Sequence, residues 1–316
     1  MDFVLINLTS NSFFENNYVE NLLLKNLNYT SIKREDLDIK KLKEEDKKII
    51  VSFSGGNKND TDLLKQIFLE KEVYGLIHFS DESLNHDYSI YKNVKKILRG
   101  YFNPKLGRSV LTIPIGFHQH DFNFRSKNQN EKKFLWTFMG SLKNERVLMN
   151  KKFSSLTPNF VNVNSSFMSD DKLSSKDYYE VLNNSLFALC PKGYTNFETF
   201  RIMEALEAKS IPIIIRSKYY DFTKIIYGNK NPLLTFSNWQ KAYDYVNNFL
   251  EKPEEIDRYS KELNEWYVDF KCNLQNKTYL YLKNDFDKNP NQITYIFQFY
   301  IYLIDAFKRI KHRYFI

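Results

Sequence analysis

The chain has 316 residues and a formal net charge of +8, and 42% of its residues are hydrophobic and 16% aromatic. Such an apolar and aromatic content excludes intrinsic disorder, while nine Gly and eight Pro exclude collagen-like and low-complexity chains. The length suits about two domains of ordinary size. Basic residues are interspersed with acidic ones, which disfavours a nucleic-acid binder. The positive net charge favours anionic ligands such as nucleotide phosphates, acidic glycans or a lipid surface.

The cysteines and the N-terminus indicate a compartment. Cys190 and Cys272 are too few for a disulfide framework, which fits a reducing environment. The opening MDFVLINL does not resemble a signal peptide, and the longest apolar stretch, 293–307, is too short to span a bilayer. The sequence therefore predicts a soluble, cytoplasmic protein.

The N-terminal part alternates short apolar runs with helical patterns. Strands are expected at 3–8, 48–53, 73–80, 95–101 and 110–115, and helices at 17–27 and 60–70. Continuous apolar strands that alternate with helices favour a parallel sheet covered on both faces. The polar stretch 123–133 has no periodicity and is interpreted as a linker.

The remainder repeats this alternation. Strands are expected at 134–139, 160–164, 186–189 and 211–215, and helices at 174–184, 198–208, 239–250, 253–269 and 291–313. The predicted class is α/β, with one α/β domain at 1–125, a second at 133–285 and a C-terminal helix at 286–316 that crosses back to the first domain. In such folds the ligand lies at the carboxyl ends of the strands, so we expect the two domains to face a central cleft.

The stretch 185–215, SLFALCPKGYTNFETFRIMEALEAKSIPIIIR, carries the clearest chemistry. It predicts a buried strand, a turn, a helix and a second buried strand. The helix N-terminus, the Thr199 hydroxyl and the forked Arg201 cation suit a diphosphate. Glu204 lies on the same helix face as Arg201 and can accept two hydrogen bonds from a ribose diol. Together they predict a nucleotide site, although a simple ion pair of Glu204 with Arg201 or Lys209 is the alternative.

The same stretch resembles the C-terminal signature of exostosin-like inverting glycosyltransferases. The segments HFSDE (78–82), VLTIPIGF (110–117) and WTFMGSLKNER (136–146) are similar to the bacterial and viral members. The chain departs from the family pattern at Thr199, where Ser is common, and at Lys209-Ser210, where Gly is usual. The spacing in Cys190-Pro191-Lys192-Gly193 is also slightly compressed.

This resemblance implies a GT-B fold with two Rossmann-like domains, an N-terminal acceptor domain and a C-terminal donor domain. It also implies inversion at the anomeric carbon and no required metal or other cofactor. The expected donor is a nucleotide-diphosphate sugar, UDP-linked xylose or a hexose, and the expected acceptor is a glycan hydroxyl in surface or protein glycan synthesis. The nucleotide-sugar-binding residues are predicted to be Gly140, Ser141, Lys143, Arg146, Pro191, Lys192, Gly193, Thr199, Arg201 and Glu204.

An inverting transfer needs a general base for the acceptor hydroxyl. Asp81 is the first candidate because it follows a buried strand, where partial desolvation would raise its pKa toward neutrality. Glu82 is second and His118 third. The alternatives are that Ser80, Asp81 and Glu82 form a helix N-terminal cap and that His118 is an exposed loop residue.

Metal sites have little support in the sequence. His118, His120 and Asp121 offer too few neighbouring ligands, and the Asp-x-Asp pairs at 36–38 and 285–287 are interpreted as surface. The terminal helix ends in basic residues, which suit either packing on the first domain or a peripheral contact with lipid or anionic glycan. A nucleotide-sugar epimerase or hydrolase on the same fold and a non-catalytic glycan-binding protein are the alternative functions.

Overall fold

A computed structural model describes residues 3–8, 15–55, 58–117, 124–125, 127–165, 173–217 and 221–283. The chain divides into two compact units. Unit 1 comprises Met1–Ile115 and Cys272–Ile316, and unit 2 comprises Gly116–Lys271. Each unit is built around its own parallel sheet, so the predicted α/β class with two parallel sheets is confirmed.

Unit 1 holds a parallel sheet in the order β2-β1-β3-β4-β5-β6. Its strands are β1 (Phe3–Asn7), β2 (Tyr29–Lys33), β3 (Lys48–Phe53), β4 (Val73–His78), β5 (Val94–Arg99) and β6 (Val110–Thr112). Its helices are α1 (Glu15–Tyr18), continued by one wider turn over Val19–Leu23, and α2 (Lys58–Glu70). The strand order reverses between β1 and β3, which is the topological switch point of this sheet.

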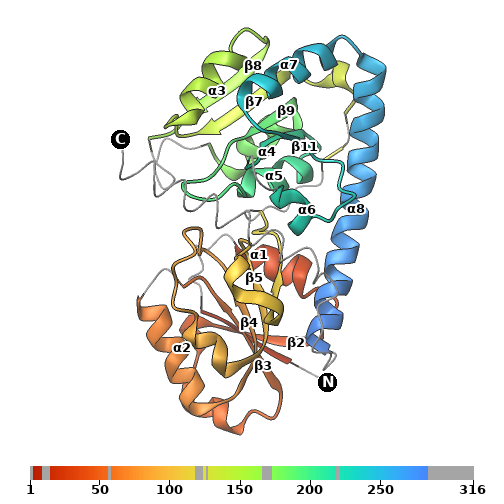
Figure 1. Ribbon diagram of the computed structural model, residues 1–316. Coiled ribbons are helices and arrows are strands. Elements are labelled where there is room, and N and C mark those ends of the chain that lie inside the picture. The colour runs from red at the N-terminus through yellow and green to blue at the C-terminus, as the bar shows by residue number, and fades with distance from the viewer. Residues whose placement is uncertain are drawn as a thin grey trace, which may run out of the picture. The chain divides into compact units, whose positions relative to one another are not determined.

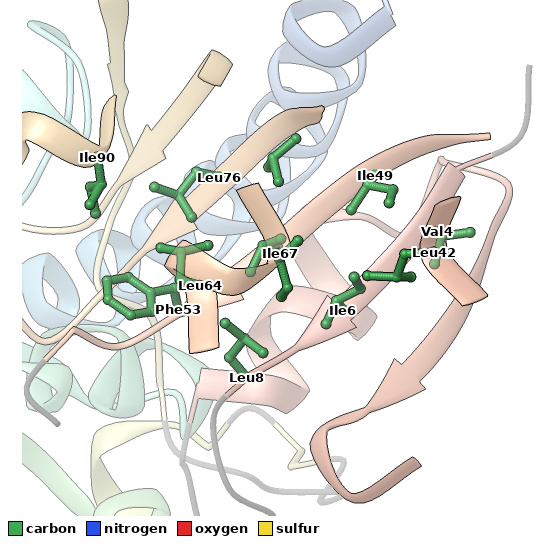
Figure 2. Close-up of a cluster of buried hydrophobic side chains, with 12 residues drawn as sticks. Val4, Ile6, Leu8, Leu42, Ile49, Phe53, Leu64, Ile67, Leu76 and Ile90 are labelled. Carbon is green, nitrogen blue, oxygen red and sulfur yellow. The ribbon is translucent and has the colours of Figure 1, made fainter. Parts of the chain in front are cut away.

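The core of unit 1 lies between the sheet and α2 (Figures 1 and 2). Ile6 of β1, Val51 of β3 and Leu76 of β4 pack with Leu64 and Ile67 of α2. All five side chains are fully buried, and each contributes about 1.5–3 kcal/mol to folding by leaving water. This packing fixes the strands whose carboxyl ends carry the polar groups described below.

Unit 2 holds a second parallel sheet in the order β11-β10-β9-β7-β8. Its strands are β7 (Phe134–Gly140), β8 (Asn159–Val163), β9 (Ser185–Cys190), β10 (Ile211–Ile215) and β11 (Leu234–Phe236). Its helices are α3 (Glu145–Phe153), α4 (Ser175–Asn183), α5 (Phe200–Glu207), α6 (Phe222–Ile226) and α7 (Trp239–Leu250). The order reverses between β7 and β9, which is the switch point of this sheet.

Helix α8 (Pro253–Lys283) belongs to both units and is longer than the predicted helix at 253–269. Its buried positions continue at helical spacing beyond that range, through Leu274, Thr278 and Leu282. At its end, the hydroxyl of Tyr74 in β4 donates a 2.8 Å hydrogen bond to the carbonyl of Leu282. The predicted helix at 291–313 and its membrane contact lie outside the described residues.

Two strands were missing from the sequence prediction, and both lie at sheet edges. Strand β2 exposes or half-exposes all of its residues, and β11 has only three residues, all half-buried. An edge strand needs no continuous apolar run because one side of it has no neighbouring strand. The signal that identified the central strands is therefore absent from these two.

The predicted linker at 123–133 lies inside unit 2, whose boundary with unit 1 falls at Gly116. Long-range hydrogen bonds attach it there. Lys127 Nζ donates to Asn184 Oδ1 at 2.6 Å, and Lys132 Nζ donates to the carbonyls of Asn183 at 2.7 Å and Lys209 at 2.9 Å. Its polar composition thus reflects hydrogen bonds to backbone carbonyls as well as exposure to solvent.

Candidate donor and acceptor sites

The predicted donor-binding residues gather at the switch point of the sheet in unit 2. Gly140 ends β7 and Ser141 follows it, while Pro191 and Lys192 follow β9, which is the neighbour of β7. Arg146, in the first turn of α3, links the two strand ends. Its Nη1 donates to the Ser141 carbonyl at 3.2 Å, and its Nη2 donates to the Lys192 carbonyl at 2.8 Å. The pieces that sequence analysis took from separate segments therefore form one cluster.

Two further predicted residues shape the loops of this cluster. The Lys143 amide donates to the Ser141 carbonyl at 3.2 Å, which closes a tight turn and leaves the Lys143 side chain exposed. The Gly193 amide donates to the Asn196 carbonyl at 2.8 Å and closes the loop that leads to α5. Both lysines of the cluster, Lys143 and Lys192, therefore lie on loops at the carboxyl edge of the sheet.

Arg201 lies in the first turn of α5 and reaches the end of β7. Its Nη2 donates a 2.9 Å hydrogen bond to the Met139 carbonyl, and its guanidinium lies 5.1 Å from the ring centre of Phe138. Its buried Nε has no hydrogen-bond partner among the described residues. The guanidinium is thus held in position, while its Nε–H donates to none of the described residues.

Gly140 makes room for this arginine. Its φ of +148° is rare for residues with a side chain, and a Cβ there would lie 3.0 Å from Arg201 Nη2. Gly140 was predicted only as a donor-binding residue, and the structure shows that the position needs a glycine because Arg201 approaches it closely.

Helix α5 begins at Phe200, two residues later than predicted, with Thr199 in the N-cap position. The Thr199 hydroxyl makes no capping hydrogen bond, and its Oγ1 is buried without a partner in the described part of the chain. The Thr199 side chain therefore does not cap the N-terminus of α5, whose positive end suits an anion.

Glu204 is buried, with 3% of its surface exposed, and its Oε2 accepts a 2.6 Å hydrogen bond from the Tyr178 hydroxyl of α4. Burial, with the nearby Glu204 carboxylate, raises the pKa of Tyr178 well above its ordinary value, so the tyrosine remains a donor. The sequence predicts that the two oxygens of this carboxylate can accept hydrogen bonds, two of them from a ribose diol. The structure commits one of these oxygens to Tyr178, a partner that the sequence did not reveal.

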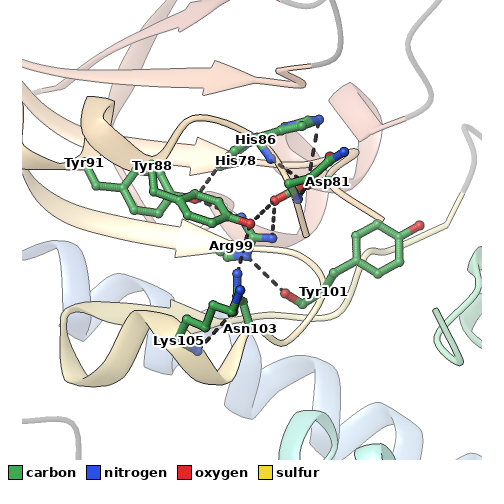
Figure 3. Close-up of polar contacts among 10 residues, drawn as sticks. His78, Asp81, His86, Tyr88, Tyr91, Arg99, Tyr101, Asn103 and Lys105 are labelled. Atoms are coloured by element: carbon green, nitrogen blue, oxygen red, sulfur yellow. Dashed lines mark hydrogen bonds and ion pairs between the residues drawn. The ribbon is translucent and has the colours of Figure 1, made fainter. Parts of the chain in front are cut away.

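Asp81 follows β4 in unit 1 and lies in a dense polar network (Figure 3). Its carboxylate accepts from Arg99 Nη2 at 2.6 Å, from the Tyr88 hydroxyl at 2.6 Å and from the Asn85 amide at 2.9 Å. The side chains of Asp81 and Arg99 are each 1% exposed. Asn103, four residues after Arg99 at the end of β5, donates a 2.9 Å hydrogen bond to the Tyr88 hydroxyl and so joins the same network.

These contacts decide the proton affinity of Asp81. Burial acts to raise its pKa, but the hydrogen bonds from Tyr88 and Arg99 and the Arg99 charge outweigh burial and leave the pKa below its ordinary value. The sequence analysis expected a raised pKa for a base at this position, and the structure shows the opposite direction. A carboxylate with this environment is a weak proton acceptor and is suited to holding the β4 and β5 ends together.

The other two predicted bases have different outcomes. Glu82 is half-buried in the turn after Asp81 and is not part of the Arg99 ion pair. His118 lies outside the described residues, as do His120, Asp121 and the Asp-x-Asp pair at 285–287. The pair Asp36 and Asp38 is exposed, as predicted, and Asp38 Oδ1 accepts from the Lys40 amide at 3.1 Å.

Sequence analysis missed a histidine pair beside Asp81. His78 Nε2 and His86 Nδ1 lie 3.0 Å apart with stacked rings, and His78 Nδ1 lies 2.5 Å from the Tyr91 hydroxyl. Burial, followed by the Arg99 charge, lowers the pKa of His78 well below its ordinary value, so it is neutral. Gly55 packs on both rings, since a Cβ there would lie 2.6 Å from each.

Glu15 is a further residue of unit 1 that the sequence did not indicate. It lies at the start of α1, after β1, and is 2% exposed. Its Oε1 accepts a 3.1 Å hydrogen bond from the Ser80 hydroxyl, which follows β4. A lone Glu in a polar segment carries no signal, because only the parallel sheet brings the β1 and β4 ends to one edge.

Among the described residues, no group of three or more His, Cys, Asp or Glu side chains is placed to hold a metal ion. Cys190 is buried, which raises the pKa of its thiol to about 12 and keeps it protonated. In the part of the chain that the structure describes, no helix has the length and apolar character of a membrane span.

The two parallel α/β sheets have the architecture of GT-B glycosyltransferases. A structure of the DNA-modifying enzyme beta-glucosyltransferase, determined with and without uridine diphosphoglucose, is 16% identical, with a TM-score of 0.55, over 90% of this chain and 100% of that chain. The T4 phage enzyme in complex with UDP and Mn²⁺ is 15% identical with a TM-score of 0.54, and its UDP-glucose complex is 17% identical with a TM-score of 0.52. Each of these two likewise covers 90% of this chain and 100% of its own. At these identities the likeness shows the fold.

The family described as RXYLT1 C-terminal domain matches residues 117–286, more than half of the 316 residues. The chain therefore belongs to this family of exostosin-like glycosyltransferases. The match covers most of unit 2 and includes the cluster around Arg201 and Arg146. Comparison with curated proteins found no similar sequence.

Proposed function

We propose that the protein transfers a sugar from a UDP-linked donor to a glycan hydroxyl, with inversion at the anomeric carbon. The donor site is the cluster at the β7–β9 switch point in unit 2. The position of Arg201 carries this assignment: the guanidinium is fixed by Met139 and Phe138 while its buried Nε has no partner among the described residues. A forked cation with a spare donor suits a diphosphate oxygen.

Neighbouring groups support a diphosphate at this position. The uncapped start of α5 and the Thr199 hydroxyl supply neutral donors, and Lys143, Arg146 and Lys192 supply positive charge. Glu204 lies one helical turn beyond Arg201 on the same face of α5, where a carboxylate suits the ribose of the same nucleotide. Positive groups that meet the leaving diphosphate stabilise its developing charge in the transition state.

The donor chemistry also draws on the fold neighbours, which were determined with UDP and with UDP-glucose. UDP-xylose and UDP-hexoses are accordingly the first donors to try. One neighbour was determined with Mn²⁺, so metal independence, which the family resemblance implies, is part of the proposal and needs its own test. A cytoplasmic location and the glycan class of the acceptor remain predictions as well.

Binding experiments test the donor site first. A thermal-shift series with UDP, GDP and CMP, followed by calorimetry, should show UDP binding to the folded protein and raising its melting temperature. Turnover is then measured as UDP release from UDP-glucose and UDP-xylose with a set of oligosaccharides, and proton NMR of the product shows whether the anomeric configuration has inverted. No binding of any of the three nucleotides would contradict the donor site.

The same assay separates the alternatives. A hydrolase would release free sugar at equal rates with and without oligosaccharide, an epimerase would return a different nucleotide sugar, and a binding protein would form no product. Duplex DNA belongs in the acceptor set because the fold neighbour is a DNA-modifying enzyme. Transfer to DNA but to no oligosaccharide would overturn the glycan acceptor.

A further inference from the structure

The carboxyl edge of the sheet in unit 1 carries a second set of buried polar groups, distinct from the Asp81 network. Glu15 follows β1, Ser52 and Ser54 lie at the end of β3, and Ser80 follows β4. These three strands are neighbours in the sheet, and β1 and β3 flank its switch point. In open α/β sheets this edge is where ligands bind.

Three of these groups have polar atoms that make no hydrogen bond within the described part of the chain. Glu15 Oε2, Ser52 Oγ and Ser54 Oγ are buried, and none has a hydrogen bond to the described residues. A buried unpaired polar atom costs about 1–3 kcal/mol, so folding alone does not favour this arrangement. Groups of this kind fit a site that hydrogen-bonds a substrate hydroxyl.

Ser80 holds the Glu15 carboxylate in place. Its φ is +61°, in the left-handed region of the backbone, which is unfavourable for any residue with a side chain. This backbone places the Ser80 hydroxyl 3.1 Å from Glu15 Oε1 and leaves Oε2 as the unpaired oxygen. The strained turn thus orients one oxygen of the carboxylate and leaves the other available.

The electrostatics of Glu15 differ from those of Asp81. Burial is the largest influence and raises the pKa of Glu15, and hydrogen bonds from its own backbone amide and from Ser80 only partly oppose it. Asp81, in contrast, has Arg99 and Tyr88 to stabilise its negative charge. Of these two carboxyl groups, Glu15 has the higher affinity for a proton.

We propose that Glu15 is the general base of the sugar transfer and that Ser80 positions it. This role rests on the proposed function. As the acceptor hydroxyl attacks, its proton passes to Glu15 Oε2 and its oxygen electron pair forms the bond to the anomeric carbon. The bond from that carbon to the diphosphate breaks, and its electron pair leaves with UDP. Glu15 ends protonated and returns the proton to solvent.

The first test compares Glu15→Gln with Glu20→Gln. Glu20 lies in the same helical segment and accepts a 2.7 Å hydrogen bond from Asn7, which makes it a matched control. With UDP-glucose or UDP-xylose as donor, Glu15→Gln should lower kcat by about 100-fold or more, and Glu20→Gln should not. UDP affinity should stay within about twofold for both variants, because the donor site lies in unit 2.

Stability separates a base from a structural residue. Because burial disfavours the charged form of Glu15, the neutral Glu15→Gln side chain should leave the melting temperature unchanged or raise it. Loss of turnover together with a large loss of stability would assign Glu15 a structural role and overturn the proposal.

A pH profile tests Ser80. Its hydrogen bond lowers the pKa of Glu15, so Ser80→Ala should raise that pKa and move the acid limb of kcat/KM to higher pH. Ser80→Gly removes the same hydroxyl and accepts the positive φ, so it gives the same readout if the alanine variant fails to fold.

The outcomes distinguish the two proposals. Normal turnover by a well-folded Glu15→Gln variant overturns the base and leaves the glycosyltransferase function in place. Binding of UDP without turnover of any tested donor by the wild-type protein overturns the proposed transfer, and the role of Glu15 with it.

Discussion

Asp81 and Arg99 form a buried ion pair of 2.6 Å that joins the turn after β4 to the last residue of β5. Both side chains are 1% exposed, so neither charge has water as an alternative partner. Removal of one member of a buried pair leaves the other charge uncompensated, which costs about 3–5 kcal/mol. The pair therefore makes Asp81 a sensitive probe of stability.

We expect Asp81→Asn to lower the free energy of unfolding by about 3–5 kcal/mol, measured by urea denaturation. Asp87→Asn is the control, since Asp87 is exposed and caps the Ser89 amide, a role that Asn also fills. The control should change stability by less than about 0.5 kcal/mol. Unchanged stability with an approximately 100-fold loss of turnover would instead restore Asp81 as the base.

The same pair predicts a pH dependence. The folded pKa of Asp81 lies below its ordinary value of 3.8, so the folded state binds this proton less tightly than the unfolded state does. The stabilisation is present above pH 3.8 and is lost as the pH falls through the folded pKa. The stability difference between the wild-type protein and Asp81→Asn should therefore shrink below pH 3.8 in acid-denaturation experiments. A constant difference down to pH 2 would contradict this.

Substitutions at Arg201 and Glu204 test the donor site. Arg201→Ala and Glu204→Gln should each weaken UDP binding by about 1.5–3 kcal/mol, or roughly 10- to 150-fold, in calorimetry. Glu204→Gln keeps an oxygen that can accept from Tyr178, so the fold should persist. Arg258→Ala, at an exposed position of α8, should leave the affinity unchanged. If all three variants bind UDP as tightly as the wild-type protein does, the nucleotide binds elsewhere.

Gly140 and Gly228 form a matched pair of glycines. Both have positive φ, but a Cβ at Gly140 would lie 3.0 Å from Arg201 Nη2, whereas one at Gly228 would have no atom within 4 Å in the described structure. Gly140→Ala should lower both stability and UDP affinity, because the backbone strains and Arg201 must move. Gly228→Ala should lower stability alone, by about 1 kcal/mol. Thermal unfolding and calorimetry on both variants separate the two effects.

Metal independence is tested by chelation. In the proposed donor site, we expect Arg201, Lys143, Arg146 and Lys192 to neutralise the diphosphate without a metal ion. Turnover should therefore persist at its full rate in EDTA. Loss of turnover in EDTA with recovery on addition of Mn²⁺ would assign a metal to the reaction.

The sequence by itself determined the parts of this protein that depend on local pattern. Predominantly apolar runs located β3, β4, β7 and β10, because a strand covered on both faces buries most of its side chains. The spacing of Arg201 and Glu204 on one helix face followed from the helical repeat alone. These features need no knowledge of distant neighbours.

The tertiary structure decided what each polar group contacts. The partner of Asp81 is 18 residues away in the sequence, that of Glu15 is 65 residues away, and that of Glu204 is 26 residues away. Burial and charged neighbours set a pKa, and both depend on which strand ends the sheet brings together. The pKa values of two carboxyl groups at one sheet edge thus shift in opposite directions. Hydrogen bonds from Tyr88 and Arg99 and the Arg99 charge lower that of Asp81, and burial raises that of Glu15.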